Sequence, residues 1–358
     1  MQKTIAVLAG DGIGPEIMSA AIKVLETINQ KFKHQIITRA GLAGGEAYER
    51  YGAHLPAETI AICEESQAIL FGAVGGPVDA GYNPKWKDVE KNVILGLRKK
   101  FDLFANLRPL KTWPAILSAS PLKPELLAGV DILILRELVS GIYFGPRRQY
   151  ERNGEKMAED VNFYSWGEIE RIIRLGFASA RLRRQKLTVV DKANVLDTSR
   201  LWREVAKKVS ADFPDIQLEF MFVDNAAAQL ACSPASFDVI VTENMFGDIL
   251  SDLGGAVVGS IGILPSACLN SRGFGLYEPV HGSAPDIAGQ NIANPTAQIL
   301  SLAMLLRHSF GLNSEAQKIE QTIISVWEQG GKTKDLARPG ENYLSTEEFT
   351  RQVCKNIN

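Results

Sequence analysis

Short runs of apolar residues alternate along the chain with longer stretches in which apolar residues recur every three or four positions. The short runs predict buried strands, and the longer periodicity predicts helices that are apolar on one side. The expected strands are residues 5–9, 68–74, 131–137, 187–192 and 238–244, and the expected helices are residues 15–28, 166–182, 199–209 and 294–310. Pro15 and Ser199 mark the starts of two of these helices. The alternation of strands with helices indicates an α/β fold.

The turn after the first expected strand, Gly10–Glu16, contains closely spaced glycines and resembles half of a dinucleotide-binding fingerprint. A Rossmann fingerprint requires the spacing G-x-G-x-x-G and an acidic residue at the end of the next strand. Here the spacing is G-x-G-x-G, and the next strand, residues 34–40, contains no carboxylate. We therefore favour a tight turn that uses the backbone freedom of glycine, and we expect any dinucleotide to bind elsewhere.

The length of 358 residues is too great for one ordinary core and predicts two domains. With 46% apolar residues and mixed charges, the composition is typical of a globular enzyme rather than a disordered or fibrous chain. The formal net charge of −2 gives no support for a general nucleic-acid or membrane partner.

Cysteine usage and the start of the chain bear on its compartment. The four cysteines, Cys63, Cys232, Cys268 and Cys354, are scattered without CxxC spacing, which argues against a zinc site or a disulfide framework. The opening apolar run, residues 4–10, is too short for a signal sequence or a membrane span. We expect a cytoplasmic protein.

The most informative polar pattern is a pair of aspartates, Asp248 and Asp252, four residues apart. On a helix they would share one face, where two carboxylates repel unless a cation lies between them. Together with Asp224, they could supply hard oxygen ligands to Mg²⁺ or Mn²⁺. An ordinary polar helix face explains the pair Asp248 and Asp252 equally well.

Three arginines, Arg98, Arg108 and Arg136, lie beside apolar segments. Each alone is typical of a salt bridge, but three guanidinium groups together favour a substrate with two carboxylates, which they bind through paired hydrogen bonds. Tyr143, in a glycine-rich turn, could donate a proton, although a core tyrosine is the commoner case. Lys192 could act as a base if burial and nearby cations lower its pKa.

A second glycine-rich loop lies near the end of the chain. Its small residues would let backbone N–H groups approach a phosphate or ribose. An aspartate in such a loop accepts hydrogen bonds from a ribose 2′-hydroxyl and repels a 2′-phosphate, which favours NAD over NADP. The candidate cofactor-binding residues are His281, Gly282, Ser283, Ala284, Asp286, Ile287 and Asn294.

Taken in order, these segments resemble the metal-dependent β-decarboxylating dehydrogenases. The resemblance spans nearly the whole chain and rests on the motifs LAGDGIGPEI, GAVGGP, LRKKFDLFANLRP, RELVSGIYFG, VDKANVL, VDNAA, NMFGDILSD, GSIGILPSA and EPVHGSAPDIAG. It implies a two-domain α/β fold of the isocitrate/isopropylmalate dehydrogenase type, not a Rossmann fold. The first domain would be discontinuous, residues 1–106 plus 260–358, and the second would be residues 107–259.

The resemblance also implies a homodimer with shared active sites, in which Lys192 and Asp224 act across the interface. Asp224 would serve in metal binding, substrate binding and catalysis, together with metal ligands Asp248 and Asp252. Lys192 would remove the hydroxyl proton of the substrate, and Tyr143 would protonate the enolate that remains after CO₂ is lost. The three arginines would bind the two carboxylates of a malate moiety.

The apolar pair Ile94 and Leu95, just before Arg98, would form a wall for the substrate's side chain. This pair favours 3-isopropylmalate as the substrate and 4-methyl-2-oxopentanoate, the leucine precursor, as the product. D-malate, tartrate, isocitrate and homoisocitrate stay open as alternatives, and a non-catalytic regulatory subunit is a further one. Departures from the family pattern at Val139–Ser140 and Leu253–Gly255 leave the fine substrate preference open.

Overall fold

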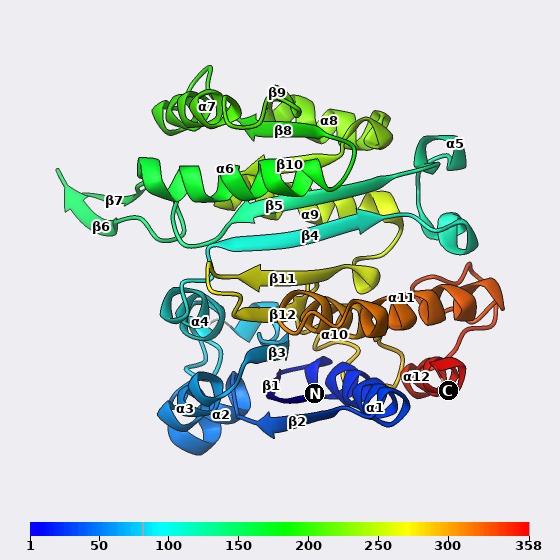
Figure 1. The fold of residues 1–358 in the computed structure, drawn as a ribbon. Helices are drawn as coiled ribbons and strands as arrows, with labels where there is room; N and C mark the ends of the chain where they lie inside the picture. Colours follow the sequence, from blue (N-terminus) through cyan, green and yellow to red (C-terminus); the bar gives the residue numbers. More distant parts are fainter. Residues whose placement is uncertain (81, 358) are drawn as a thin grey trace. The chain divides into compact units, whose positions relative to one another are not determined.

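The computed structural model describes residues 1–80 and 82–357, and its chain divides into two compact units (Figure 1). Unit 1 consists of Met1–Leu103, Thr112–Pro121 and Val258–Asn358, and unit 2 consists of Phe104–Lys111 and Leu122–Val257. The first unit is thus discontinuous. The division differs in detail from the boundaries expected from the sequence, because the chain crosses from one unit to the other more often than expected.

The additional crossing is residues 112–121, which we expected in the second domain. Within unit 1 the 3-10 helix η3 (Pro114–Ala119) packs against α11 (Asn313–Glu328), and the rings of Trp113 and Trp327 lie 5.1 Å apart. A pair of aromatic rings at this separation stabilises a contact beyond the area that it buries. This packing explains why the short segment groups with unit 1.

Unit 1 contains the strands β1 (Gln2–Gly10), β2 (Gln35–Ala40), β3 (Ala68–Ala73), β11 (Pro265–Leu269) and β12 (Gly275–Pro279). Their order is β2-β1-β3-β12-β11, and only the β11–β12 pair among them is antiparallel. Its helical segments are α1 (Gly14–Phe32), α2 (Gly45–Tyr51), α3 (Ala57–Glu65), η1 (Val78–Ala80), η2 (Lys91–Leu95), α4 (Gly96–Lys100), η5 (Ile261–Ile263), α10 (Thr296–His308), α11 and α12 (Thr346–Ile357). The apolar helix α10 is buried over most of its length and packs on β11 and β12.

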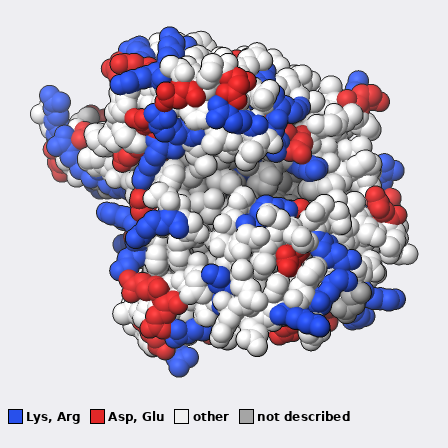
Figure 2. Space-filling view, in the orientation of Figure 1, with Lys and Arg blue, Asp and Glu red and all other residues white. Residues whose placement is uncertain are grey.

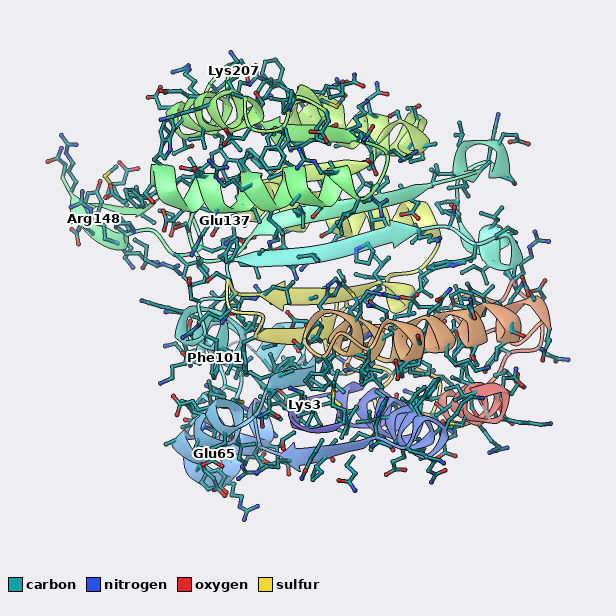
Figure 3. All side chains as sticks on the ribbon, in the orientation of Figure 1. Lys3, Glu65, Phe101, Glu137, Arg148 and Lys207 are labelled. Atoms are coloured by element: carbon teal, nitrogen blue, oxygen red, sulfur yellow. The ribbon has the colours of Figure 1, made fainter. Side chains whose placement is uncertain are left out.

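Unit 2 contains the strands β4 (Ala105–Lys111), β5 (Asp131–Glu137), β8 (Lys186–Asp191), β9 (Gln217–Phe222) and β10 (Val239–Thr242). Their order is β4-β5-β10-β8-β9, with β4 antiparallel to β5 and the other pairs parallel. The helical segments are α5 (Pro124–Leu127), α6 (Trp166–Arg181), α7 (Asp197–Ser210), α8 (Val223–Cys232), η4 (Pro234–Ser236) and α9 (Asn244–Val258). An exposed antiparallel ribbon, β6 (Arg147–Arg152) with β7 (Glu155–Asp160), carries Arg148, which Figure 3 labels.

The expected strands and helices are present, with one correction at a helix start. Helix α7 begins at Asp197, so Ser199 lies inside its first turn rather than before it. There the Ser199 hydroxyl accepts a hydrogen bond from the backbone N–H of Lys192, at 3.0 Å. The serine therefore anchors the loop that follows β8 instead of capping the helix.

Figure 2 shows basic and acidic side chains interspersed on the face in view, which agrees with the small net charge. Within residues 1–80 and 82–357, no helix combines the length and the apolar character that a membrane crossing requires.

Candidate active site

Helix α9 holds Asp248 and Asp252 on one face, as their spacing predicts. Both carboxylates approach the same nitrogen of Arg108: Nη1 lies 3.5 Å from Asp248 Oδ1 and 3.6 Å from Asp252 Oδ1. The arginine side chain is 7% exposed, whereas those of Asp248 and Asp252 are 36% and 57% exposed. The aspartate pair therefore faces a buried cation on one side and remains accessible on the other.

Arg136, near the end of β5, is the second cation of this cluster. Its Nη1 donates to Asp248 Oδ1, while Nε and Nη2 donate to the Asn244 side-chain oxygen at 3.0 and 2.8 Å. Asn244 begins α9, one helical turn before Asp248, so the two acceptors share a face of the helix. The buried guanidinium thus links β5 to α9 and fixes the orientation of Asp248.

Arg108 is held by residues of its own strand and of α9. Its Nε donates to the Asn106 side-chain oxygen at 2.5 Å, and its Nη1 donates to the hydroxyl of Ser251. Asn106 and Arg108 lie on the same face of β4 because alternate residues of a strand point the same way. Asn106, Ser251 and Asn244 are not among the residues predicted from the sequence, although each stands one to four residues from a predicted site residue.

Tyr143 completes the cluster in unit 2. Its hydroxyl donates to Asp248 Oδ2 at 3.2 Å, and its ring lies 5.7 Å from the Arg136 guanidinium carbon. Burial raises the pKa of the Tyr143 phenol above its usual value, and the negative charge of Asp248 adds to this effect. The phenol therefore keeps its proton at neutral pH, which is the state required of a proton donor.

The charge state of Asp252 tests whether the pair suits a metal ion. Burial raises the pKa of the Asp252 carboxyl; Arg108 opposes this shift, and the Asp248 carboxylate reinforces it. Because the Asp248 carboxylate raises the pKa of Asp252, a cation between the two would stabilise both groups in their charged forms. The donor set of hard oxygens and the accessible side of Asp252 fit Mg²⁺ or Mn²⁺.

Lys192 and Asp224 form a separate pair in unit 2, with Lys192 Nζ 2.6 Å from Asp224 Oδ1. The hydrogen bond from Lys192 holds the pKa of the Asp224 carboxyl below its usual value. Among the described residues, no group of three or more His, Cys, Asp or Glu side chains could hold a metal ion. One chain alone therefore does not gather Asp224 with Asp248 and Asp252.

In unit 1, Arg98 is buried at α4 and forms an ion pair with Glu278 of β12. Arg98 Nη2 lies 3.0 Å from Glu278 Oε1, and the two side chains are 8% and 11% exposed. Ile94 and Leu95 precede it in the π-helix η2 and are partly buried. Glu278 had no signal in the sequence, since it lies 180 residues from its partner.

The glycine turn after β1 contacts its own chain. The N–H of Asp11 donates to Ala73 O at 2.7 Å, and that of Ile13 donates to Ser283 O at 2.8 Å. Gly12 has φ +58°, and a Cβ there would lie 2.0 Å from the Ser283 oxygen, so no side chain fits. Because these N–H groups are already bonded within the protein, the turn is not a pyrophosphate cradle.

The second glycine-rich loop has both packed and accessible residues. Ala284 and Ile287 pack against a small cluster that includes Ile13, whereas Gly282 and Asp286 are exposed. The sequence-predicted residues of this loop therefore divide into those that anchor it and those that a ligand could reach.

His281 and Asn294 lie at the two ends of this loop. The Nδ1 atom of His281 bonds to Gly282 O at 2.9 Å, and its buried Nε2 has no hydrogen-bond partner among the described residues. Asn294 donates to Asp335 Oδ2 at 3.0 Å and accepts from the N–H of Thr296. The exposed residues between these two ends fit a bound nucleotide.

The two α/β units and the buried arginine–aspartate cluster are typical of α/β enzymes that act on carboxylates. The model of the isocitrate/isopropylmalate dehydrogenase family matches residues 4–353. The chain belongs to this family, which confirms the expected fold and the resemblance seen in the sequence.

Curated relatives give the same result. The 3-isopropylmalate dehydrogenase of Bacillus licheniformis is 54% identical over 355 residues, which cover 99% of this chain and 95% of the relative. That of Aquifex aeolicus is 50% identical over 360 residues, which cover 99% of this chain and 96% of the relative.

Solved structures resemble the chain over its full length. The isocitrate dehydrogenase of Methylococcus capsulatus has a TM-score of 0.88 and 34% identity, covering 100% of this chain and 99% of that one. An apo β-decarboxylating dehydrogenase of Thermococcus kodakarensis has a TM-score of 0.80 and 34% identity, covering 100% and 96%.

Proposed function

We propose that the chain catalyses the NAD-dependent oxidative decarboxylation of 3-isopropylmalate to 4-methyl-2-oxopentanoate in leucine biosynthesis. The observation that carries this proposal is the identity of 54% to a 3-isopropylmalate dehydrogenase over 99% of the chain. By comparison, the solved isocitrate dehydrogenase of Methylococcus capsulatus is 34% identical to this chain, which is a lower value. The apolar pair Ile94 and Leu95 supports the same substrate, since an apolar wall disfavours one that ends in a hydroxyl or carboxylate.

Arg98, Arg108 and Arg136 are the proposed ligands of the substrate's carboxylates. The two arginines of unit 2 are buried and held by neutral partners as well as by carboxylates, so their orientation is fixed before a substrate arrives. Each guanidinium can offer paired donors to a planar carboxylate. Fixed donors reduce the entropy lost when the substrate binds.

Asp248 and Asp252 are the proposed metal ligands in this chain, with Asp224 contributed across a dimer interface. When bound, Mg²⁺ or Mn²⁺ supplies Lewis-acid chemistry: it lowers the pKa of the substrate's C2 hydroxyl and stabilises the enolate left after CO₂ departs. The accessible carboxylates on α9 and the raised pKa of Asp252 beside Asp248 support this assignment.

Two side chains carry the proton transfers in this proposal. Lys192 takes the hydroxyl proton, directly or through water, as hydride leaves C2 for NAD. Tyr143 then donates its phenolic proton to the enolate carbon, a role supported by its raised pKa and its position beside Asp248. Because Lys192 and Asp224 pair with each other away from α9, we propose that they serve the partner subunit's site in a homodimer.

NAD is the proposed cofactor, and the loop that follows β12 is its proposed binding site. The accessible Asp286 carboxylate would accept hydrogen bonds from the ribose hydroxyls and repel a 2′-phosphate. With its Nδ1 bonded to Gly282 O, the His281 ring would hold the start of the loop for the nucleotide. Ala284, Ile287 and Asn294 would hold the loop in place.

The test is an assay of the purified chain alone with 3-isopropylmalate, NAD and Mg²⁺. We expect NADH and CO₂ to form in equal amounts, and we expect EDTA to abolish turnover until Mg²⁺ is restored in excess. Activity only after addition of a second kind of subunit would instead favour a regulatory subunit. We disfavour that alternative because the proposed arginines, lysine, tyrosine and aspartates are all present.

A further inference from the structure

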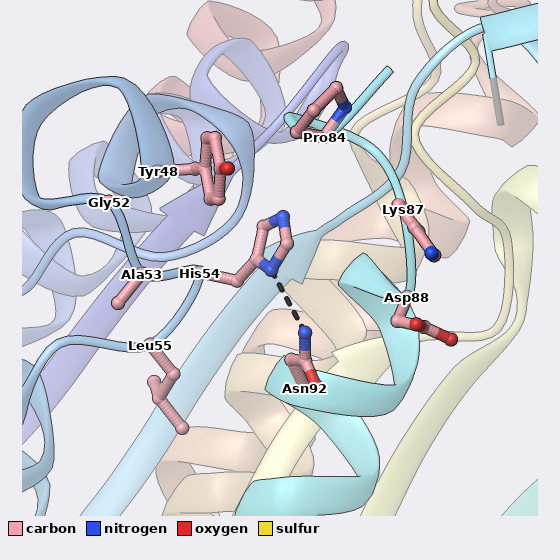
Figure 4. Close-up of a pocket in the computed structure, with 9 residues that line it drawn as sticks. All are labelled: Tyr48, Gly52, Ala53, His54, Leu55, Pro84, Lys87, Asp88 and Asn92. Carbon is pink, nitrogen blue, oxygen red and sulfur yellow. Dashed lines mark hydrogen bonds between the residues drawn. The ribbon is translucent and has the colours of Figure 1, made fainter. Parts of the chain in front are cut away.

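His54 lies outside the proposed catalytic set, yet its ring is buried and fully engaged (Figure 4). Its Nε2 bonds to the Lys85 carbonyl oxygen at 2.9 Å, and its Nδ1 lies 3.0 Å from Asn92 Nδ2. The Tyr48 ring stacks on it with centroids 4.8 Å apart. One imidazole thus joins α2, the segment before η2, and η2 itself.

The partners determine the protonation pattern of this ring. A carbonyl oxygen only accepts hydrogen bonds, so His54 Nε2 must carry a hydrogen toward Lys85. In the neutral ring Nδ1 is then an acceptor, which matches a donating amide of Asn92. His54 therefore forms a directed link in which Asn92 donates to the ring and the ring donates to the backbone.

The link ends on an unusual element. Residues Lys91–Leu95 form a π-helix, a geometry that is rare and is often found at functional sites. This turn carries Asn92 together with Ile94 and Leu95, the proposed wall for the substrate's side chain. A π-helical turn has wider hydrogen-bond spacing than an α-helix, so contacts from outside help to hold it.

On the side of Asn92 the π-helix borders open space rather than packed core. A pocket of about 390 Å³ is lined there by residues that include Tyr48, His54, Lys87 and Asn92 (Figure 4). Because few residues pack on this side, the hydrogen bond between Asn92 and His54 is a specific contact that holds the exposed part of the turn. At the end of the turn, a Cβ on Gly96 would lie 3.9 Å from Leu55, the neighbour of His54.

The position of Arg98 does not depend on the His54–Asn92 hydrogen bond. Its guanidinium is held by Glu278 at 3.0 Å, and the preceding residue, Leu97, is fully buried. A loss of the His54–Asn92 bond should therefore disturb Ile94 and Leu95 more than the carboxylate-binding arginine.

We propose that His54 is a positioning residue for substrate specificity: through Asn92 it fixes the π-helix and with it the apolar wall formed by Ile94 and Leu95. This inference rests on the proposed function, because it requires that the wall contact the substrate's side chain. It predicts that His54 affects recognition of an isopropyl group and has little effect on recognition of the malate moiety.

The experiment compares five variants for 3-isopropylmalate and D-malate, which share the malate moiety and differ in the side chain. His54→Ala, Asn92→Ala and the double variant that combines them each remove the hydrogen bond between the two side chains. His54→Asn restores an acceptor near the position of Nδ1 and serves as the conservative rescue. Lys87→Ala changes the exposed lining of the same pocket and leaves the His54–Asn92 hydrogen bond in place, so it is the matched control.

For His54→Ala we expect kcat/KM for 3-isopropylmalate to fall about fivefold, mainly through KM, while that for D-malate changes less than about twofold. The double variant should lose no more than either single alanine variant, because both remove the same bond. His54→Asn should recover part of the loss, and Lys87→Ala should behave as wild type.

A second readout does not depend on activity. Hydrogen exchange of backbone amides in residues 91–97, followed by mass spectrometry, should be faster in His54→Ala than in wild type and unchanged in Lys87→Ala. Unchanged exchange in His54→Ala, equal losses for the two substrates, or additive losses in the double variant would overturn the positioning role. Failure of the proposed function is distinct, because it shows as a wild-type preference for D-malate.

Discussion

At Arg108 a single buried nitrogen stands within 3.6 Å of two carboxylates, and this arrangement governs the charge balance of the site. Removing two charged groups from water is costly unless each is compensated. Asp248 is compensated by Arg136 as well, whereas Asp252 has a raised pKa and a side chain 57% exposed. Asp252 is therefore the aspartate that can be neutralised with least effect on folding.

We predict that Asp252→Asn lowers metal-dependent kcat/KM for 3-isopropylmalate on the order of 100-fold or more, while the melting temperature changes little. The substitution keeps the shape of the side chain and removes one charge from the proposed ligand set. Steady-state kinetics at several Mg²⁺ concentrations and thermal unfolding measure the two effects. Asp212→Asn, an exposed aspartate paired with Arg174, is the control; wild-type activity in Asp252→Asn would remove this residue from the metal site.

Glu137 offers a test of burial through pH. It is fully buried at the end of β5 (labelled in Figure 3), and burial raises its pKa from 4.5 to about 7, opposed by hydrogen bonds from the Val139 and Ser140 N–H groups. Because the folded-state pKa is the higher one, the folded state binds more protons between these values. Stability from this group is therefore greatest below pH 4.5 and declines by roughly 3 kcal/mol as pH rises to about 7.

Glu137→Gln removes this titration and should flatten that part of the profile. We expect the free energy of unfolding of the variant, relative to wild type, to be higher at pH 8 than at pH 5. Denaturant unfolding at the two pH values measures the difference. The variant also loses a hydrogen-bond acceptor, which lowers its free energy of unfolding by the same amount at both pH values. The diagnostic quantity is therefore how the difference between variant and wild type changes from pH 5 to pH 8. If that difference is the same at both pH values, Glu137 is not buried as a carboxylic acid.

Residue types and spacing predicted the acidic pair and the arginines, because a helix fixes which side chains share a face. The neutral partners Asn106, Asn244 and Ser251 were missed, since amides and hydroxyls are common and only the strand register and helix turn bring them to the arginines. Glu278 was beyond reach for another reason: its partner Arg98 is distant in sequence, and only the fold brings them together.

At the scale of elements, the strands that the sequence predicted are short apolar runs, and several of the strands that were missed lack that signal. β6 and β7 are polar on both sides because they form an exposed ribbon. β11 and β12 contain Pro265 and Pro279, which normally argue against strands. The π-helical turn η2 was also unforeseen, because its residues follow no pattern that separates it from an α-helix.

The start of α6 provides a prediction at this scale. Ser165 and Glu168 form a capping box, in which Glu168 N donates to Ser165 Oγ and Ser165 N donates to Glu168 Oε2 at 2.8 Å. Ser165→Ala should lower the free energy of unfolding by about 1 kcal/mol, because the first turn loses its side-chain acceptor. Urea unfolding measures this, and Ser165→Thr, which keeps the hydroxyl, should lie near wild type. Equal losses in both variants would show that packing, not the cap, stabilises the helix start.

For the whole molecule, length predicted two domains, and the resemblance implied that the first is discontinuous. The short crossing at residues 112–121 could not be predicted, because it depends on the contact between Trp113 and Trp327 within unit 1. The proposed dimer likewise goes beyond a single chain, and its support is the pairing of Lys192 with Asp224 away from α9.

Subunit complementation tests the shared site. Lys192→Ala and Arg136→Ala should each be nearly inactive as homodimers, because one lacks the proposed base and the other a proposed carboxylate ligand. In a mixed dimer one of the two sites would receive both an intact lysine and an intact arginine, so about half of the wild-type activity per dimer should return. The measurement is turnover by mixed dimers purified through two different tags; no recovery in verified mixed dimers would place both residues in the same subunit's site.

The proposed function requires that the site oxidises and decarboxylates a malate with an apolar side chain. The most direct measurement is kcat/KM of the purified protein for 3-isopropylmalate, D-malate, tartrate and isocitrate, each with NAD and with NADP in the presence of Mg²⁺. We predict the highest value for 3-isopropylmalate with NAD. A higher value for D-malate or isocitrate, or for NADP, would contradict the account.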